Sequence, residues 1–463
     1  MRTHRILSFL LVICLLGGMM ILPATAESVD LQLQCTNAVL IDASYGEVLY
    51  EQSAYDQAYP ASMTKVMTAL LTLEAIADGT ITEDTMVTVS EYASMKTYSD
   101  ESTANLLPGE QMSIKDLLYC LMLPSANDAA KALAEHLGGS CDAFVQEMNA
   151  RAKELGCKGT HFVNPNGLHD PNHYSTAYDI ALIYKAAMEH NLFNTIVLAK
   201  DYTTAATNMN GERYFFNTNG LISNYYYGGH VYDKCIGGKT GSTTEAGKCL
   251  VAAARDGDKV MISVIMGSGP IVGADGSERL GQFDESKRLL EYGLMNFRRI
   301  TLTQPEEAVA TVAVSFSADG KEVGVIPQGS ISVMLHNNFN QKDVKTKITL
   351  FEDTIEAPVV EGQVLGTMRL YTDEQDFGDL ELVAERSMEY SKKLYRQSKR
   401  QDFMDRIGRK ILIVFFILLM LPMAALITLR CVNVYRRKQR KKRAAQRRAA
   451  QRRAAQQPRR PQQ

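Results

Sequence analysis

The chain has 463 residues, about three times the ~150 of a typical domain, so two or more domains are expected. Apolar residues make up 46% and charged residues 22%, which excludes a chain disordered throughout, a collagen and a polytopic membrane protein. The net charge of −2 hides an asymmetry: residues 436–463 hold 13 Lys or Arg and no acidic residue, which leaves −15 for residues 1–435. An acidic body with a separate basic tail is not the profile of a nucleic-acid-binding fold.

The N-terminal residues 1–26 are predicted to be a secretory signal peptide. Arg2 and Arg5 precede a 17-residue apolar run that ends at Leu22, and Ala24-Thr25-Ala26 supplies a small-x-small cleavage pattern. An uncleaved anchor is the alternative, but the run is short for a membrane span. The mature chain is therefore expected to begin near Glu27.

Hydrophobic patterns then predict a domain of mixed helices and strands. Val66, Leu70, Leu73 and Ala77 recur at helical spacing and indicate one buried stripe. We expect a hairpin at 38–50, helices at 62–77, 113–137 (broken at 123–125), 141–155 and 176–190, a loop at 164–167, strands at 237–241, 249–254 and 260–266, and a closing helix at 284–297.

Residues 299–385 have a different pattern, in which apolar residues occupy alternate positions. Such period-two alternation is typical of strands with one buried face. It occurs at Ala308, Ala310, Val312, Val314 and Phe316, and again at Val344, Thr346, Ile348 and Leu350. We therefore expect a small β-sandwich there, followed by a partly helical juxtamembrane stalk at 386–410.

A second apolar run, Ile411 to Leu429, is predicted to be a transmembrane helix. Its 19 uncharged residues cover about 28 Å at ~1.5 Å per residue. The basic residues of the tail 430–463 follow it, and the positive-inside rule then predicts a cytoplasmic tail with the body outside. The tail is expected to contact anionic lipid. A nucleic-acid or partner site in the tail is the alternative, although basic runs are common at this position.

The eight cysteines give no metal or redox motif, because no C-x-x-C pair occurs. Cys235 and Cys249 flank an expected hairpin turn centred near Thr244. That register places Cys235 opposite roughly Ala254, so these two cysteines do not face one another. Free, mostly buried thiols are expected.

The first motif with chemical potential is Ser62-Met63-Thr64-Lys65. A serine hydroxyl is a poor nucleophile near neutral pH and needs a base. Positions i and i+3 share one helix face, so the Lys65 amine can reach the Ser62 hydroxyl. At a helix N-terminus, the backbone N–H groups and the dipole also favour developing negative charge at Ser62. The pattern is weak alone, since a capping serine followed by an exposed lysine also produces it.

Two further motifs follow. Ser125-Ala126-Asn127 lies in the break between helices, where side chains can point into a cleft, although a serine there is also a good helix cap. In Lys239-Thr240-Gly241, a lysine and a hydroxyl on an edge strand can hold a carboxylate, and a glycine permits close approach of substrate; a plain strand end is the alternative. S-x-x-K, S-x-N and K-T-G each occur once, in this order, 63 and 114 residues apart.

With these three motifs the chain resembles D-alanyl-D-alanine carboxypeptidases, which are low-molecular-weight penicillin-binding proteins of serine peptidase family S11. Ala126 stands where related enzymes often have Asp. Further family-like blocks are Pro60 to Lys65, Leu117 to Gly138, Phe162 to Asp179 and Ile236 to Thr243. The resemblance covers roughly 30–297, and the β-region to 385 resembles the family's C-terminal domain. A full transmembrane helix with a basic tail departs from the amphipathic anchor common in the family.

The resemblance implies an α/β (α+β) penicillin-binding-protein/β-lactamase-like transpeptidase fold, with an antiparallel sheet flanked by helices and a helical subdomain. The implied domains are a catalytic domain at 27–298, a small all-β domain at 299–385 and one C-terminal transmembrane helix at 411–429. The implied substrates are peptidoglycan stem peptides ending in D-Ala-D-Ala, and β-lactams are the implied covalent inhibitors. The resemblance implies no metal and no cofactor, a place in the bacterial cell membrane, and a role in cell-wall biogenesis and cell shape.

The resemblance also implies site roles. Ser62 is the expected nucleophile, Lys65 the acylation base and Ser125 a proton relay toward the leaving amine. Asn127 is expected to position the substrate amide. The residues implied to bind the terminal carboxylate and the neighbouring substrate backbone are Lys239, Thr240, Gly241 and Ser242, and the backbone N–H groups of Ser62 and Ser242 are the implied oxyanion hole.

Other functions on the same motifs remain open. A class A β-lactamase would deacylate with a Glu, commonly in E-x-x-x-N, and no such pattern lies between Asn127 and Lys239. A D,D-endopeptidase or transpeptidase would use the same residues. A penicillin-sensing membrane receptor is a different class, disfavoured because the tail has no recognisable output domain. His161, His169 and His173 are interpreted as loop or structural residues.

Overall fold

The computed structural model describes residues 31–272 and 278–455, so the predicted signal peptide lies outside the described residues. The chain divides into two compact units. Unit 1 holds the described residues up to Pro305 together with Gly329–Lys347 and Met368–Leu380. Unit 2 holds Glu306–Gln328, Ile348–Thr367 and the described residues from Glu381 onward.

The centre of unit 1 is a five-stranded antiparallel sheet with the order β2-β1-β9-β8-β7. Its strands are β1 (Asn37–Asp42), β2 (Val48–Gln52), β7 (Cys235–Thr243), β8 (Gly247–Asp256) and β9 (Lys259–Ser268). The predicted hairpin at 38–50 is confirmed, as are the three strands expected after residue 233. The strand that carries the K-T-G motif, β7, lies at an edge of the sheet.

Both faces of the sheet are buried at β1, β8 and β9, which explains why these three strands are nearly continuous apolar runs. Successive side chains of a strand point to opposite faces. In β1, Val39 and Ile41 join a core cluster with the helices of the S-x-x-K region. Ala38 and Leu40 join a second cluster with Phe283 and its neighbours in α9 (Gly281–Asn296). The sheet therefore separates two hydrophobic layers.

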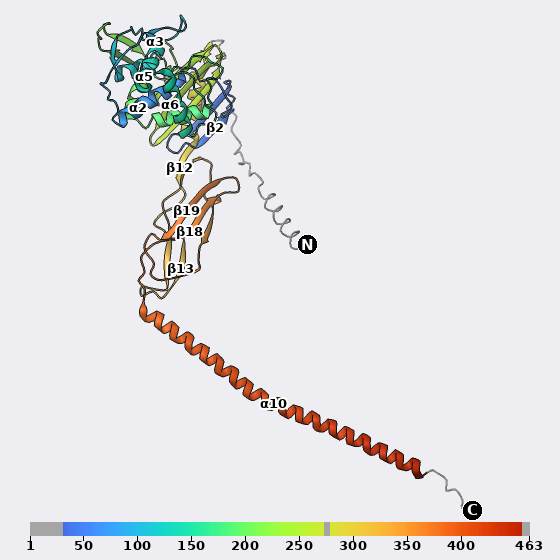
Figure 1. Ribbon diagram of the computed structural model, residues 1–463. Coiled ribbons are helices and arrows are strands. Elements are labelled where there is room, and N and C mark those ends of the chain that lie inside the picture. The colour runs from blue at the N-terminus through green and yellow to red at the C-terminus, as the bar shows by residue number, and fades with distance from the viewer. Residues whose placement is uncertain (1–30, 273–277, 456–463) are drawn as a thin grey trace, which may run out of the picture. The chain divides into compact units, whose positions relative to one another are not determined.

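The remaining helices of unit 1 gather around α2 and α5 (Figure 1). Their bounds are η1 (Ala61–Thr64), α2 (Lys65–Ala77), α3 (Glu91–Ser94), α4 (Ile114–Met122), α5 (Asn127–Gly138), α6 (Cys141–Glu154), α7 (Ala177–Ala187) and α8 (Asn191–Leu198). Each predicted helix is present, and the predicted break at 123–125 separates α4 from α5. Neither α3 nor α8 was predicted, because each has only one or two turns and shows little periodicity. In the predicted stripe, Ala77 is exposed because the helix ends there.

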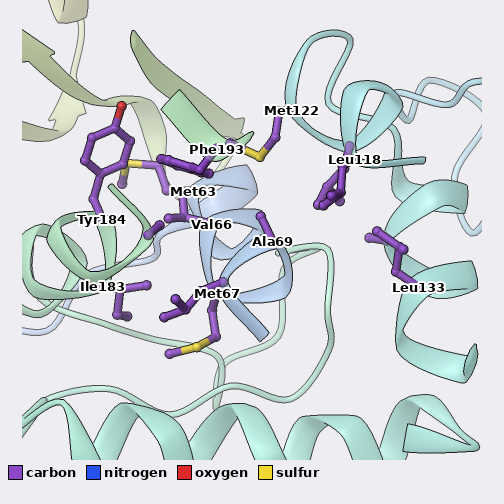
Figure 2. Close-up of a cluster of buried hydrophobic side chains, with 14 of the residues drawn as sticks. Met63, Val66, Met67, Ala69, Leu118, Met122, Leu133, Ile183, Tyr184 and Phe193 are labelled. Atoms are coloured by element: carbon purple, nitrogen blue, oxygen red, sulfur yellow. The ribbon is translucent and has the colours of Figure 1, made fainter. Parts of the chain in front are cut away.

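The helix α2 is held on several sides by apolar side chains. Met63, Val66 and Met67 have no exposed surface. Figure 2 shows these three with Ala69 among side chains from four other helices: Leu118, Met122, Leu133, Ile183, Tyr184 and Phe193. Such packing fixes rotamers and backbone together. The turn that carries Ser62 and Lys65 is therefore mounted on a rigid element.

Short strand pairs complete unit 1. They are β3 (Met86–Thr88) with β4 (Gln111–Ser113), β5 (Asp201–Thr204) with β6 (Arg213–Phe216), β10 (Pro270–Val272) with β11 (Glu278–Leu280), and β12 (Phe297–Thr301) with β15 (Ser332–His336). The first three pairs order loops that sequence periodicity left unassigned, since their strands have only three or four residues, too few to show alternation.

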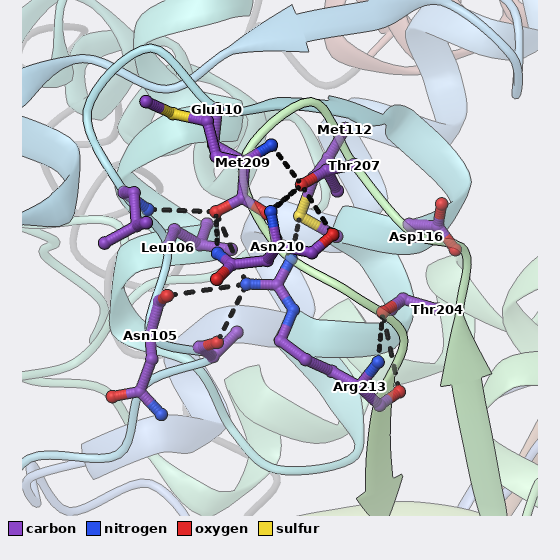
Figure 3. Close-up of polar contacts among 12 residues, drawn as sticks. Asn105, Leu106, Glu110, Met112, Asp116, Thr204, Thr207, Met209, Asn210 and Arg213 are labelled. Carbon is purple, nitrogen blue, oxygen red and sulfur yellow. Dashed lines mark hydrogen bonds and ion pairs between the residues drawn. The ribbon is translucent and has the colours of Figure 1, made fainter.

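A buried ion pair joins the loop before β4 to β6 (Figure 3). The Nη2 atom of Arg213 lies 2.5 Å from Oε1 of Glu110, a carboxylate with no exposed surface. Burial alone would raise the pKa of Glu110, but hydrogen bonds from the Leu107 N–H, Thr207 and Arg213 outweigh it and hold that pKa below its ordinary value. The carboxylate is therefore charged at neutral pH and anchors both loops.

The all-β part of the chain contains a six-stranded sheet with the order β16-β18-β19-β14-β13-β17. The bounds are β13 (Ala310–Ser315), β14 (Glu322–Pro327), η2 (Gln341–Asp343), β16 (Lys345–Leu350), β17 (Thr354–Glu356), β18 (Val364–Tyr371) and β19 (Asp376–Ala384). Val312 and Val314 are buried, as the alternation predicts. In β16 the predicted buried face is wrong: Thr346 and Ile348 are exposed, because β16 lies at the sheet's edge.

The chain continues as one helix, α10 (Lys392–Ala455), which contains the predicted span 411–429 and Pro422. Among the residues that the structure describes, it is the one helix long and apolar enough to cross a membrane. The large apolar side chains of the span are exposed to solvent in the isolated chain, which is the arrangement expected of a lipid-facing segment. The helix is therefore a candidate membrane anchor.

The cysteines follow the predicted register. Cys235 pairs with Ala254 in the β7–β8 ladder, whereas Cys249 pairs with Gly241. The seven cysteines within the described part of the chain are free, and all but one are shielded from solvent to some degree. Burial raises the pKa of Cys35 to about 12, so this thiol stays protonated.

Candidate active site

Ser62 and Lys65 face one another across a single helical turn. Ser62 lies in η1, and Lys65 is the first residue of α2. The Lys65 Nζ atom lies 2.9 Å from Ser62 Oγ and 2.7 Å from the backbone oxygen of Asn166, to which it donates a hydrogen bond. The contact expected from the i, i+3 spacing is present, and the second partner comes from a loop a hundred residues away.

The Lys65 amine is buried completely. Burial lowers its pKa well below the ordinary 10.5, and the neighbouring positive charge of Lys239 lowers it further. The carboxylates of Glu101 and Asp128 act in the opposite direction. A lysine depressed in this way gives up its proton more readily, so it can accept one from a neighbouring hydroxyl near neutral pH.

The loop Asn164–Gly167 packs directly against the turn that carries Ser62, which we call the serine turn (Ala61–Lys65). Thr68 of α2 donates a hydrogen bond to the backbone oxygen of Pro165 at 2.6 Å. Gly167 has φ = +82°, and a Cβ atom there would lie 1.9 Å from the backbone oxygen of Ala61. Only glycine fits this close approach. The loop that presents the Asn166 oxygen to Lys65 is thereby fixed on two sides.

His173 connects the following segment to the same turn. The backbone N–H of Val163 donates to His173 Nδ1 at 3.1 Å, so the Nε2–H group donates to Thr64 Oγ1 at 2.8 Å. Burial lowers the pKa of His173 to about 4, and the ring is neutral at pH 7. The interpretation of His173 as a structural residue therefore agrees with its contacts, and what it supports is the S-x-x-K turn.

The second motif begins in a strained turn before α5. Ser125 has φ = +65°, a conformation that costs a non-glycine residue free energy and that clusters at functional sites. Its Oγ atom is buried and has no hydrogen-bond partner among the described residues. Asn127 donates from its backbone N–H to the Ser102 oxygen at 2.8 Å and from Nδ2 to Glu101 Oε2 at 3.1 Å.

The third motif supplies a buried cation at the sheet edge. Lys239 is 1% exposed, and burial lowers its pKa to about 7. The Oγ1 atom of Thr240 lies 2.8 Å from that of Thr218, which in turn donates to the Leu123 oxygen at 3.2 Å. Thr218 therefore joins the K-T-G strand to the break that holds Ser125.

The strand β7 packs directly against the serine turn. A Cβ atom on Gly241 would lie 2.9 Å from the Pro60 oxygen and 3.2 Å from the Ser62 nitrogen. The glycine is thus required by the protein's own backbone. Ser242 follows it on the strand and accepts a hydrogen bond from Lys248 at 3.1 Å.

Comparison with known families agrees with this geometry. Residues 23–269 match the model of peptidase S11, D-alanyl-D-alanine carboxypeptidase, which covers more than half of the chain. The chain belongs to the D-alanyl-D-alanine carboxypeptidase family. Members of this family are serine peptidases. Residues 297–390 match the C-terminal domain of penicillin-binding protein 5, which identifies the all-β region.

Relatives in this family align over most of their own length. The D-alanyl-D-alanine carboxypeptidase DacF of Bacillus subtilis is 34% identical over 360 residues, which are 78% of this chain and 87% of that protein. DacC of Escherichia coli is 33% identical over 71% of this chain and 78% of its own. Penicillin-binding protein 5 of Haemophilus influenzae has a similar structure, with a TM-score of 0.63 at 30% identity over 77% of this chain and 98% of that one.

The structure brings the three predicted motifs together through one predicted site residue, Gly241, and one that the sequence did not single out, Thr218. Gly241 meets the Ser62 turn, and Thr218 joins Thr240 to the segment before Ser125. The residues not anticipated are Asn166, which acts through its backbone oxygen, and the side chains of Thr218, Glu101 and His173. For Asn166 and His173 the sequence signal is the family-like block Phe162 to Asp179, which includes the Asn-Pro-Asn-Gly loop but assigns these residues no role in the site.

Gly167 gives a direct test of how the serine turn is held. We expect Gly167→Ala to slow covalent labelling by a fluorescent penicillin at least about tenfold, because the added methyl group displaces Ala61 and with it Ser62. It should also lower the melting temperature, since φ = +82° disfavours alanine. Gly211→Ala is the matched control, because a Cβ there meets nothing within 4 Å. Equal labelling rates for both variants and the parent protein would contradict this account.

Proposed function

We propose that this protein is a serine D-Ala-D-Ala carboxypeptidase that removes the terminal D-alanine of peptidoglycan stem peptides through an acyl-enzyme on Ser62. The observation that carries the proposal is the buried, pKa-depressed Lys65 amine 2.9 Å from Ser62 Oγ. Family membership supports the reaction class, and the enclosed lysine supplies the base that serine chemistry requires.

In the proposed acylation step, Ser62 Oγ attacks the carbonyl carbon of the D-Ala-D-Ala peptide bond and passes its proton to neutral Lys65. The backbone N–H groups of Ser62 and Ser242 stabilise the oxyanion. The C–N bond then breaks, and the departing amine of D-alanine takes a proton by way of Ser125. Water hydrolyses the resulting ester and frees Ser62. A β-lactam acylates the same oxygen when its ring amide opens.

Substrate placement follows from the other motif residues. Lys239 in its protonated form and the Thr240 hydroxyl bind the terminal carboxylate at the end of the site. Gly241 and Ser242 continue the strand beside the substrate backbone. Asn127 donates to the substrate amide from the opposite side. The peptide is therefore held at both ends of the bond that breaks, which is the requirement for a productive attack geometry.

The first test is release of D-alanine from diacetyl-L-Lys-D-Ala-D-Ala by the detergent-solubilised chain. Ser62→Ala is expected to abolish release and penicillin labelling while the protein stays folded, because Lys65 keeps its hydrogen bond to the Asn166 oxygen when the Ser62 hydroxyl is removed. Ser94→Ala, a surface serine at the end of α3, is the control and should behave like the parent. Covalent penicillin labelling of the Ser62→Ala variant would show that Ser62 is not the nucleophile.

The second test is the pH dependence of kcat/KM. Lys65 must be neutral to accept a proton, so activity rises as pH increases through its depressed pKa. Lys239 must be charged to bind the carboxylate, so activity falls as pH increases beyond its pKa of about 7 in the empty site. Lys239→Arg keeps the cation at all accessible pH values and is expected to remove the alkaline fall. A fall of the same size and midpoint in that variant would show that another group controls the alkaline limb.

We also propose the domain limits and orientation expected from the sequence: signal peptide 1–26, catalytic domain 27–298, β-sandwich domain 299–385, stalk 386–410, membrane span 411–429 and cytoplasmic tail 430–463. The candidate anchor α10 and the 13 basic residues after the span support this orientation, with the catalytic domain outside and the tail against anionic lipid.

The orientation can be checked by adding a protease to intact cells that carry a C-terminal epitope tag. The catalytic domain should be digested, while a small fragment with the span and tail stays protected because the membrane shields it. Permeabilised cells serve as the control and should lose the tag. Loss of the tag from intact cells would refute the orientation.

A further inference from the structure

We propose that Glu101 is a specificity-determining residue that binds the side-chain ammonium of a diamino acid placed immediately before D-Ala-D-Ala in the stem peptide. This inference rests on the proposed function, because it needs a peptide bound with its scissile bond at Ser62. It concerns a residue outside the three motifs, on the loop that precedes α4.

The Glu101 carboxylate is in direct contact with the second motif. Its Oε2 atom accepts a hydrogen bond from Asn127 Nδ2 at 3.1 Å, and its Oε1 atom accepts one from the Thr97 backbone N–H at 2.9 Å. A carboxylate has about four acceptor positions, so each oxygen retains capacity for another donor. The side chain is half-buried, which leaves it accessible to a ligand and less screened than a surface charge.

The loop that carries Glu101 is bound to the start of α5. The Asn127 N–H donates to the Ser102 oxygen at 2.8 Å. The Asp128 carboxylate accepts from the backbone N–H groups of Ala104 at 2.9 Å and Leu106 at 3.0 Å. Glu101 is therefore held beside Asn127 by contacts that do not involve its own side chain, and a charge held in this way is preorganised for recognition.

The far end of the same loop is fixed by the Glu110–Arg213 pair (Figure 3). Arg213 Nη1 also donates to the backbone oxygen of Ala104 at 3.2 Å. The picture shows the Arg213 guanidinium enclosed between Asn105 and Glu110, with Thr207 and Asn210 beside the carboxylate. The loop between Glu101 and Glu110 is therefore restrained at both ends.

The contact with Asn127 gives Glu101 a place relative to the substrate in the proposed binding mode, on the side away from the leaving group. In the proposed binding mode, Lys239 and Thr240 hold the terminal carboxylate, Ser62 meets the scissile carbonyl and Asn127 meets the next amide. An extended peptide advances about 3.3–3.6 Å per residue. The group beyond Asn127 therefore faces the residue before D-Ala-D-Ala, and a carboxylate at that place favours a cationic side chain.

Glu101 is less suited to act as the general base of the reaction. Lys65 already lies 2.9 Å from Ser62 Oγ, whereas the hydrogen-bond partners of the Glu101 carboxylate are Asn127 and Thr97. Burial lowers the pKa of Lys65, and the Glu101 charge raises it, so this carboxylate opposes the lysine's role as a base. These contacts are compatible with a role in which the Glu101 carboxylate binds a positively charged group of the substrate.

The test compares two peptides that differ only in one charge: Nα-acetyl-L-Lys-D-Ala-D-Ala and its Nα,Nε-diacetyl form. At low ionic strength the kcat/KM of the parent chain is expected to be about fivefold higher for the peptide with the free amine, mainly because its KM is lower. A factor of about five is the largest effect expected from an ion pair that is partly exposed to solvent. Glu101→Gln removes the charge and keeps one oxygen that can accept a hydrogen bond from Asn127 or from Thr97. The preference, which is the ratio of the two kcat/KM values, should therefore disappear, whatever change in rate the two peptides share.

Glu91→Gln is the matched control, since Glu91 is an exposed carboxylate in α3 of the same region, and it should keep the preference. A parent without preference, or a Glu101→Gln variant that keeps it, would overturn the inference. An equal loss of kcat/KM with both peptides would show that Glu101 positions Asn127. Accumulation of acyl-enzyme in the Glu101→Gln variant would show that Glu101 is a deacylation base. Either result also overturns the inference. Absence of Ser62-dependent release from both peptides would instead refute the proposed function.

Discussion

The structure depends above all on the complete burial of one lysine amine. Lys65 has no exposed surface, and a buried charge is costly unless it is paired. Within the described part of the chain no carboxylate forms an ion pair with it; its close partners are the Ser62 hydroxyl and the backbone oxygen of Asn166. This environment favours the neutral amine, and it exists only while α2, the Asn164–Gly167 loop and β7 stay in place. Much of the fold of unit 1 can be understood as the support for that enclosure.

The sheet serves the same purpose from the other side. Its two buried faces make it a fixed wall, and its edge strand β7 brings the Lys239 cation and the backbone of Gly241 against the serine turn. Thr218 then ties this edge to the helix break of the second motif. Three segments that lie 63 and 114 residues apart along the chain thus meet at one place because a single strand edge contacts a single turn.

What residue patterns alone could predict was local, whereas the fold and the meeting of three distant motifs in one site were predicted only through the family resemblance. The Ser62–Lys65 contact follows from helical spacing, and the pairing of Cys235 with Ala254 follows from the position of a turn. The Asn166 oxygen, Thr218 and Glu101 reach the site through tertiary contacts across 20 to 100 residues, and no periodicity encodes such contacts. The exposed face of β16 shows the same limit, since alternation indicates a strand but not whether that strand lies at an edge.

The free thiols of unit 1 have a consequence for biogenesis. Six of the described cysteines lie in this unit without a disulfide, and burial keeps their thiols protonated and unreactive. Native packing is therefore reached without any oxidation step. A chain exported unfolded can acquire its final form in a compartment that lacks thiol oxidases and isomerases, and changes in redox poise leave its stability untouched. The buried thiols are protected from oxidants only while the hydrophobic core of unit 1 remains folded.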